Sequence, residues 1–119
     1  MKSVIAVVVL LLAVAAGSDV TGAWTGSFKV AGGDHAIPQV ISFKQDGNKL
    51  AGSAGPDAGE QYPIENGKVD GDRVTFELTS GEWRFSYRLK QSGDHLTGDL
   101  ELKSVNDSRT AKVELKKSK

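Results

Sequence analysis

The two histidines are the residues whose type and position first suggest chemistry. His35 and His95 each follow an aspartate, Asp34 and Asp94, and a carboxylate that orients an imidazole is a feature of metal sites and of general bases. The two histidines belong to different turns at opposite ends of the predicted sheet, so they cannot share one ion. Adjacent residues of an extended chain also point to opposite sides. We therefore expect solvated turn residues and no metal site.

Acid–base and nucleophilic chemistry find no better support. The glutamates are spread singly over different stretches, as solubilising residues on an outer face are; they are Glu60, Glu65, Glu77, Glu82, Glu101 and Glu114. No serine lies in a nucleophile motif with a histidine and an acid, and no Gly-rich phosphate loop opens a helix. We therefore expect no catalytic residues and no cofactor, in a protein that is not an enzyme.

Tight turns define the elements that position these residues. Asp46-Gly47, Asp70-Gly71 and Ser92-Gly93 each separate two stretches in which apolar and polar residues alternate. Two-residue hairpin turns need positive φ values, which Asp, Asn and Gly tolerate, so Asp-Gly in this setting is a strong hairpin signal. The alternation predicts about eight strands, near residues 23–30, 38–45, 49–54, 61–69, 73–79, 82–90, 95–103 and 109–117.

Strands with one apolar and one polar face are typical of an antiparallel sheet. No segment after the N-terminal apolar run has the spacing of a helix that could cover the apolar face. We therefore predict an all-β protein, a single small antiparallel up-and-down barrel of about eight strands, because closure buries that face and removes both sheet edges. A two-sheet sandwich with a similar number of strands is the alternative.

The inward positions of the predicted strands hold most of the large side chains. The aromatic members of this set are Trp24, Phe28, Phe43, Phe76, Trp83, Phe85 and Tyr87. An eight-stranded barrel is only just wide enough for its own side chains, so we expect a filled core with no large cavity. Gly26, Gly52 and Gly98 share the inward parity, where a missing side chain permits the tight bending that closure demands.

The first 17 residues have the features of a secretory signal peptide. Lys2 supplies a positive start, Val4–Val14 is an unbroken apolar run, and Ala13–Gly17 offers small residues for cleavage. A membrane span needs roughly 20 apolar residues, so we expect no transmembrane segment after cleavage. We assign residues 1–17 to the signal peptide and 18–119 to the β-barrel domain, and we expect export to the periplasm or secretion.

Composition excludes several further classes of protein. The chain has no cysteine, so an exported form has neither a disulfide framework nor a Cys-based metal site. Its 15 basic and 15 acidic residues balance, and a near-neutral surface of mixed sign argues against nucleic acid or an anionic membrane as partner. We expect a monomer.

The segment Gly22-Ala23-Trp24 at the start of the first predicted strand is similar to the Gly-x-Trp that opens lipocalins, avidins and related calycin barrels. In those families the tryptophan closes one end of the barrel, and a basic residue from the last part of the chain packs over it. Lys117 is the better candidate for that residue, because its strand ends at Trp24's end of the barrel, whereas Arg109 opens the same strand at the other end. The chain also looks like small exported bacterial calycin-like barrels of uncharacterised function.

Two hypotheses for the function follow, and both propose a binding protein. The first is a module that holds a small apolar ligand at the barrel mouth, beside the loops that contain Gly33, His35, Pro56 and Asp57. The second is a barrel that binds a secreted or periplasmic protein, either as a structural envelope protein or as a protease inhibitor. The chain resembles the periplasmic inhibitor of secreted metalloproteases in outline, and this resemblance implies that residues 18–20 would form the inhibitory segment.

Overall fold

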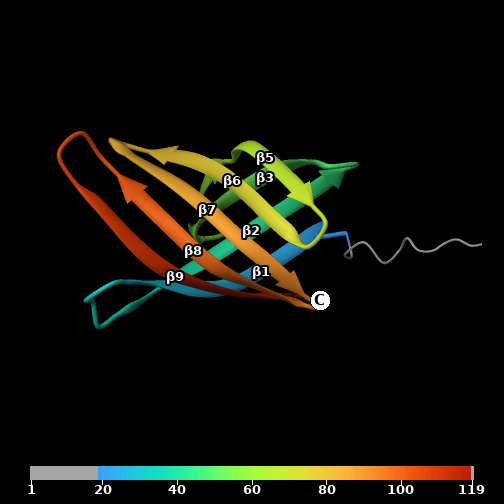
Figure 1. Ribbon diagram of the computed structural model, residues 1–119, viewed down its shortest axis with the longest axis horizontal. Helices are drawn as coiled ribbons and strands as arrows, with labels where there is room; N and C mark the ends of the chain where they lie inside the picture. Colours follow the sequence, from blue (N-terminus) through green and yellow to red (C-terminus); the bar gives the residue numbers. More distant parts are fainter. Residues whose placement is uncertain (1–18, 119) are drawn as a thin grey trace, which may run out of the picture.

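The computed structural model describes residues 19–118, so the expected signal peptide lies outside the described residues. The described chain consists of strands joined by short turns and loops (Figure 1). The strands are β1 (Gly22–Val30), β2 (Ala36–Asp46), β3 (Lys49–Asp57), β4 (Glu60–Pro63), β5 (Glu65–Asp70), β6 (Arg73–Ser80), β7 (Trp83–Ser92), β8 (His95–Lys103) and β9 (Ser108–Lys117). Within residues 19–118 there is no helix with the length and apolar character that crossing a membrane requires.

Hydrogen bonds close the strands into one antiparallel barrel. From β5 to β9 each strand pairs with the next, β9 pairs with β1, β1 with β2, β2 with β3, and β3 with β5, which completes a ring of eight strands. The short β4 is the additional strand and pairs with the second half of β3. The predicted up-and-down barrel is therefore confirmed, and the sandwich alternative is wrong because the sheet closes on itself.

One predicted strand, residues 61–69, is broken in the structure into β4 and β5. The break has a cause in the sequence, because Tyr62 and Ile64 pack against the core on one parity and Val69 is buried on the other. A strand keeps both sets inward only if it gains a residue between them, which is what a β-bulge does. The pairing of β5 with β6 shifts register between Glu65 and Lys68, and Asn66 there has a φ of 53°.

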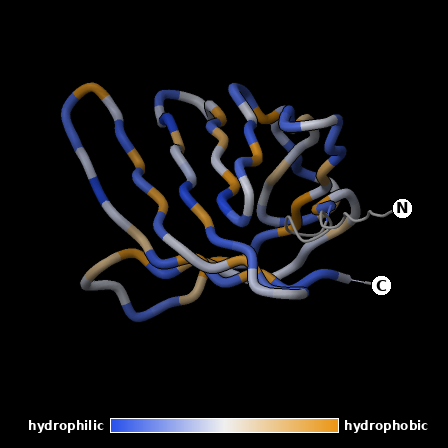
Figure 2. Tube along the Cα trace, turned by 45° about the vertical axis from the view of Figure 1, so that its right-hand side comes forward, coloured by the Kyte–Doolittle hydropathy of each residue, from blue (hydrophilic) through white to orange (hydrophobic). Residues whose placement is uncertain are grey.

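The buried core consists almost entirely of apolar residues, and apolar and polar residues alternate along the strands (Figure 2). Aromatic rings fill its centre: Phe76 stacks on Tyr87 with ring centroids 4.3 Å apart, and Phe43 meets Phe76 edge to face at 5.3 Å. Offset-stacked and edge-to-face pairs are the favoured arrangements of aromatic side chains. The filled core expected from the sequence is present in this part of the barrel.

Close approach of neighbouring strands explains the inward glycines. A Cβ atom at Gly98 would overlap the backbone carbonyl oxygen of Arg88 on β7, and one at Gly52 would overlap that of Ser42 on β2. The backbone can fold this tightly only where no side chain intervenes. The glycines therefore mark places where the sheet curls to close.

Candidate functional site

The end of the barrel where β1 begins is closed by Trp24, which is fully buried. The Trp24 indole Nε1 donates a hydrogen bond to the carbonyl oxygen of Val20 at 2.9 Å. Lys117 is the register partner of Trp24 on β9, and its Nζ lies 6.0 Å from the centroid of the Trp24 ring. A Cβ at Gly22 would lie 3.1 Å from Lys117 Cε, so the glycine leaves room for the lysine stem. Gly22, Trp24 and Lys117 thus form one structural unit.

The segment before β1 also belongs to this closed end. Val20 is fully buried, and its backbone N–H donates to the side-chain oxygen Oε1 of Gln45 at 3.0 Å. The backbone N–H of Gln45 in turn donates to Thr21 Oγ1 at 2.9 Å. Residues 20 and 21 are therefore packed against the closed end of the barrel.

The opposite end of the barrel contains an open cavity with a volume of about 370 Å³. We call this cavity the mouth. Most of its lining is apolar, including Phe28, Val30, Leu78, Phe85 and Leu102. Ligand sites are typically concave and mostly apolar, with volumes of about 300–1,000 Å³. The mouth falls at the small end of that range, although the sequence led us to expect little empty volume.

Strand β7 shows how deep the mouth reaches. Trp83, Phe85 and Tyr87 line it in succession along the inward face, and exposure falls from half-buried at Trp83 and Phe85 to 2% at Tyr87. Along β2 the exposed fraction falls in the same way, from 38% at Ile37 to 5% at Gln39. We call the buried lining residues the floor and the exposed ones the rim.

A polar pair lies at this floor. The Tyr87 hydroxyl donates a hydrogen bond of 2.6 Å to Gln39 Oε1. Gln39 Nε2 donates to the carbonyl oxygen of Pro38 at 3.1 Å. Burial raises the pKa of the Tyr87 hydroxyl above its ordinary value, so the group is a neutral phenol over the physiological range.

Charged groups that line the mouth lie at its rim. The Arg109 guanidinium lies 5.9 Å over the Trp83 ring, and its Nε donates to the Asp107 carboxylate at 3.1 Å. Across the opening, the Tyr62 hydroxyl donates to Glu60 at 2.6 Å. Arg109 thus packs at the end of the barrel away from Trp24, which leaves Lys117 as the cation over Trp24.

The loop residues singled out from the sequence have different positions. Pro56 lines the mouth. Gly33 donates its backbone N–H to Val30 O at 2.8 Å, and Asp57 Oδ1 accepts from the backbone N–H groups of the turn that follows it. His35 is exposed in the loop after β1. These three residues shape or border the loops at this end of the barrel but do not line the mouth.

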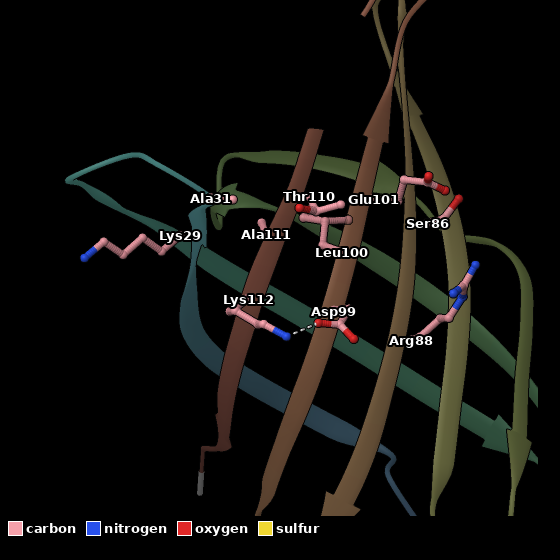
Figure 3. A pocket seen from close by; sticks show the side chains of 10 residues that line it. All are labelled: Lys29, Ala31, Ser86, Arg88, Asp99, Leu100, Glu101, Thr110, Ala111 and Lys112. Atoms are coloured by element: carbon pink, nitrogen blue, oxygen red, sulfur yellow. Dashed lines mark hydrogen bonds and ion pairs between the residues drawn. The ribbon is translucent and has the colours of Figure 1, made fainter. Parts of the chain in front are cut away.

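A second hollow, of about 350 Å³, lies on the outer face of the barrel over β7, β8 and β9 (Figure 3). Charged side chains from these strands surround it, and Lys112 Nζ lies 2.6 Å from Asp99 Oδ1. The side chains of this ion pair are 82% and 64% exposed. Such exposed pairs contribute little energy, so we interpret this hollow as the solvated outer surface of the sheet.

Neither a search for metal-binding side chains in the described part of the chain nor comparison with known proteins identifies a further site or a family. Within residues 19–118, no group of three or more His, Cys, Asp or Glu side chains is placed to hold a metal ion. The exposed His95, the register partner of Ser92 and Lys116, lies at the closed end, away from His35. No protein-family model matches the chain, and no curated protein matches it.

The sequence did not lead us to predict the hydrogen bond between Gln39 and Tyr87 at the floor. Tyr87 was identified as an inward aromatic residue, but its hydroxyl partner was not. The available signal was Gln39, which shares the parity of Ile41 and Phe43 and so places an amide among apolar inward residues. A polar residue in that setting needs a buried partner, although the pattern does not say which strand supplies it.

Proposed function

We propose that this protein binds a small apolar molecule in the mouth of the barrel. The observation that carries the proposal is the open cavity of about 370 Å³, lined mainly by aromatic and aliphatic side chains. Burial of apolar surface there would supply roughly 25 cal/mol for each Å² removed from water. The polar floor and the charged rim would orient the bound molecule.

The size of the mouth limits the ligand. A volume near 370 Å³ suits a compact molecule of one to three rings or a short chain, because pockets for drug-sized ligands reach about 1,000 Å³. The closed end offers no continuation, since Phe43, Phe76 and Trp24 fill the barrel below the floor. We therefore expect selectivity for compact ligands over long-chain lipids.

Membership of the exported calycin-like barrels is part of the same proposal. The closed antiparallel barrel, Gly22-Ala23-Trp24 and the lysine over the indole support it. With the expected signal peptide, the protein would meet its ligand in the periplasm or outside the cell. Burial of Val20 weakens the protease-inhibitor hypothesis, since the proposed inhibitory segment overlaps the closed end.

The proposal is tested with a fluorescent probe and one cavity-filling variant. Native mass spectrometry of the protein purified from its own host should show a co-purifying small molecule, and the environment-sensitive dye N-phenyl-1-naphthylamine should bind with increased fluorescence. Ser80→Trp, which introduces a large ring into the mouth lining, should reduce dye affinity at least ten-fold. The matched control is Thr79→Trp on the exposed face of the same strand, which should bind normally. Equal binding by both variants, or no dye binding by the wild type, would rule out the mouth as the site.

A further inference from the structure

Two polar side chains at the floor of the mouth, Gln39 and Tyr87, have hydrogen-bonding capacity that the described residues 19–118 leave unused. A glutamine side chain has two N–H donors, and a tyrosine hydroxyl both donates and accepts. Gln39 Nε2 donates one hydrogen bond to Pro38 O, and the Tyr87 hydroxyl donates its hydrogen bond to Gln39 Oε1. Among residues 19–118, one amide N–H of Gln39 and the lone pairs of the Tyr87 oxygen have no further hydrogen-bond partner. Both residues line the cavity.

In the part of the chain that the structure describes, the charged residues that line the mouth lie apart from this pair. The charged residues that line the mouth are Glu60 and Arg109, and both are exposed at the rim. Gln39 and Tyr87 are 5% and 2% exposed. Moving a carboxylate or ammonium to such a depth without a counter-charge costs far more than a neutral hydrogen bond returns. The floor therefore discriminates against charged head groups.

We infer that the ligand is a small uncharged molecule whose apolar body fills the mouth and whose single hydroxyl or carboxamide group hydrogen-bonds to Gln39 and Tyr87. The inference rests on the proposed function and specifies its ligand class. A hydroxyl or carboxamide can donate to the Tyr87 oxygen and accept from the Gln39 amide at once. A hydrocarbon would satisfy neither group, and a fatty acid carboxylate could accept but would be buried with its charge.

A matched series of two-ring compounds separates these cases. Naphthalene, 2-naphthol, naphthalene-2-carboxamide and 2-naphthoate share one apolar body and differ in the polar group. Dissociation constants at pH 7 are measured by NMR chemical-shift titration of the mature protein. Because a neutral hydrogen bond contributes roughly three- to ten-fold in affinity, the naphthol and the carboxamide should bind that much more tightly than naphthalene. The naphthoate should bind at least ten-fold more weakly than the carboxamide.

Variants then assign the preference to the floor. Gln39→Met/Tyr87→Phe removes both polar partners together while keeping their volumes, so that no buried group is left unpaired. It should bind naphthalene at least as tightly as the wild type, because its floor is more apolar, and lose the preference for the naphthol and the carboxamide. Tyr62→Phe is the control, because Tyr62 also lines the mouth but its hydroxyl bonds Glu60 at the rim. It should retain the preference.

The outcomes distinguish this inference from the proposed function. If none of the four compounds binds the wild type, the proposed function fails and the inference falls with it. If all four bind with equal affinity, or if the double variant keeps the preference, the mouth is a ligand site but the head-group assignment is wrong. Tightest binding of 2-naphthoate would likewise overturn the assignment, because it would require a charged head at the floor or the rim. Naphthalene binding by the double variant at least as tight as by the wild type verifies that its cavity is intact.

Discussion

Trp24 and Lys117 show what a single contact contributes to the closed end. The lysine Nζ lies 6.0 Å from the ring centroid, which is the outer limit of the range over which an ammonium is attracted to an aromatic face. Lys117 is half-buried, so solvent screens part of the attraction. The indole contributes mainly through burial and through its hydrogen bond to Val20, and the cation is a smaller addition.

The first prediction separates these two contributions with a double-mutant cycle. Trp24→Ala should lower the free energy of unfolding by about 3–5 kcal/mol, as large-to-small core changes do. Lys117→Ala should lower it by under about 1 kcal/mol, and the two changes should couple by about 0.5 kcal/mol. Urea unfolding of the four proteins provides the values. The control is Lys116→Ala, at the exposed neighbouring position, which should not couple with Trp24→Ala. If the effects of the Trp24 and Lys117 changes are additive, the cation does not interact with the ring.

Two glycines in the strands and turns are needed for different reasons. Gly98 lies within β8 opposite Leu89, where a Cβ would overlap the Arg88 carbonyl oxygen of the neighbouring strand. Gly71 lies in the turn between β5 and β6 with a φ of 63° and open space around it. The first glycine is needed for the distance between strands, and the second for its backbone conformation.

The second prediction compares alanine at these positions. Gly98→Ala should lower the free energy of unfolding by about 3 kcal/mol or more, because the overlapping atom is backbone and the strands must move apart. Gly71→Ala should cost about 1–2 kcal/mol, the price of a left-handed conformation in a residue with a Cβ. Thermal and urea unfolding provide the comparison. A Gly98→Ala protein as stable as Gly71→Ala would show that strand separation at Gly98 is easily adjusted.

The elements were predictable to the extent that they depend on local pattern. Alternation and the glycine-containing turns located the strands of the barrel, except that residues 61–69 were predicted as one strand and form two, β4 and β5. Parity and strand direction placed Lys117 rather than Arg109 at Trp24. Within residues 61–69, the inward positions change from even-numbered at Ile64 to odd-numbered at Val69, which indicates a break in the strand. The pattern alone does not locate the bulge at Asn66. The pairing of Gln39 with Tyr87 was out of reach, because the two residues lie on strands that are not neighbours, and contact across a barrel depends on strand tilt and side-chain length.

The whole molecule combines two ends with different roles. At one end Val20 and Trp24 are buried without exposure, so this end stabilises the barrel. At the other end the mouth leaves Trp83 and Phe85 half-buried, and the apolar surface there remains available to a ligand. The filled core that we expected from the sequence is therefore confined to one part of the barrel. The unfilled volume lies at the mouth, beside the connection between β1 and β2.

The last prediction tests whether the two ends act independently. Val20→Ala should lower the free energy of unfolding by about 2 kcal/mol through lost burial, with no change in dye affinity. Ser80→Trp should reduce dye affinity at least ten-fold and leave stability equal or greater, since the new ring covers apolar surface that is open in the wild type. The double variant should show the sum of both effects, because changes at separated sites without shared partners add to within roughly 0.3–0.5 kcal/mol. Urea unfolding and dye titration of the three variants measure both properties. A loss of dye binding in Val20→Ala with the fold retained would mean that closure at Trp24 sets the shape of the mouth, so that the two ends form one coupled unit.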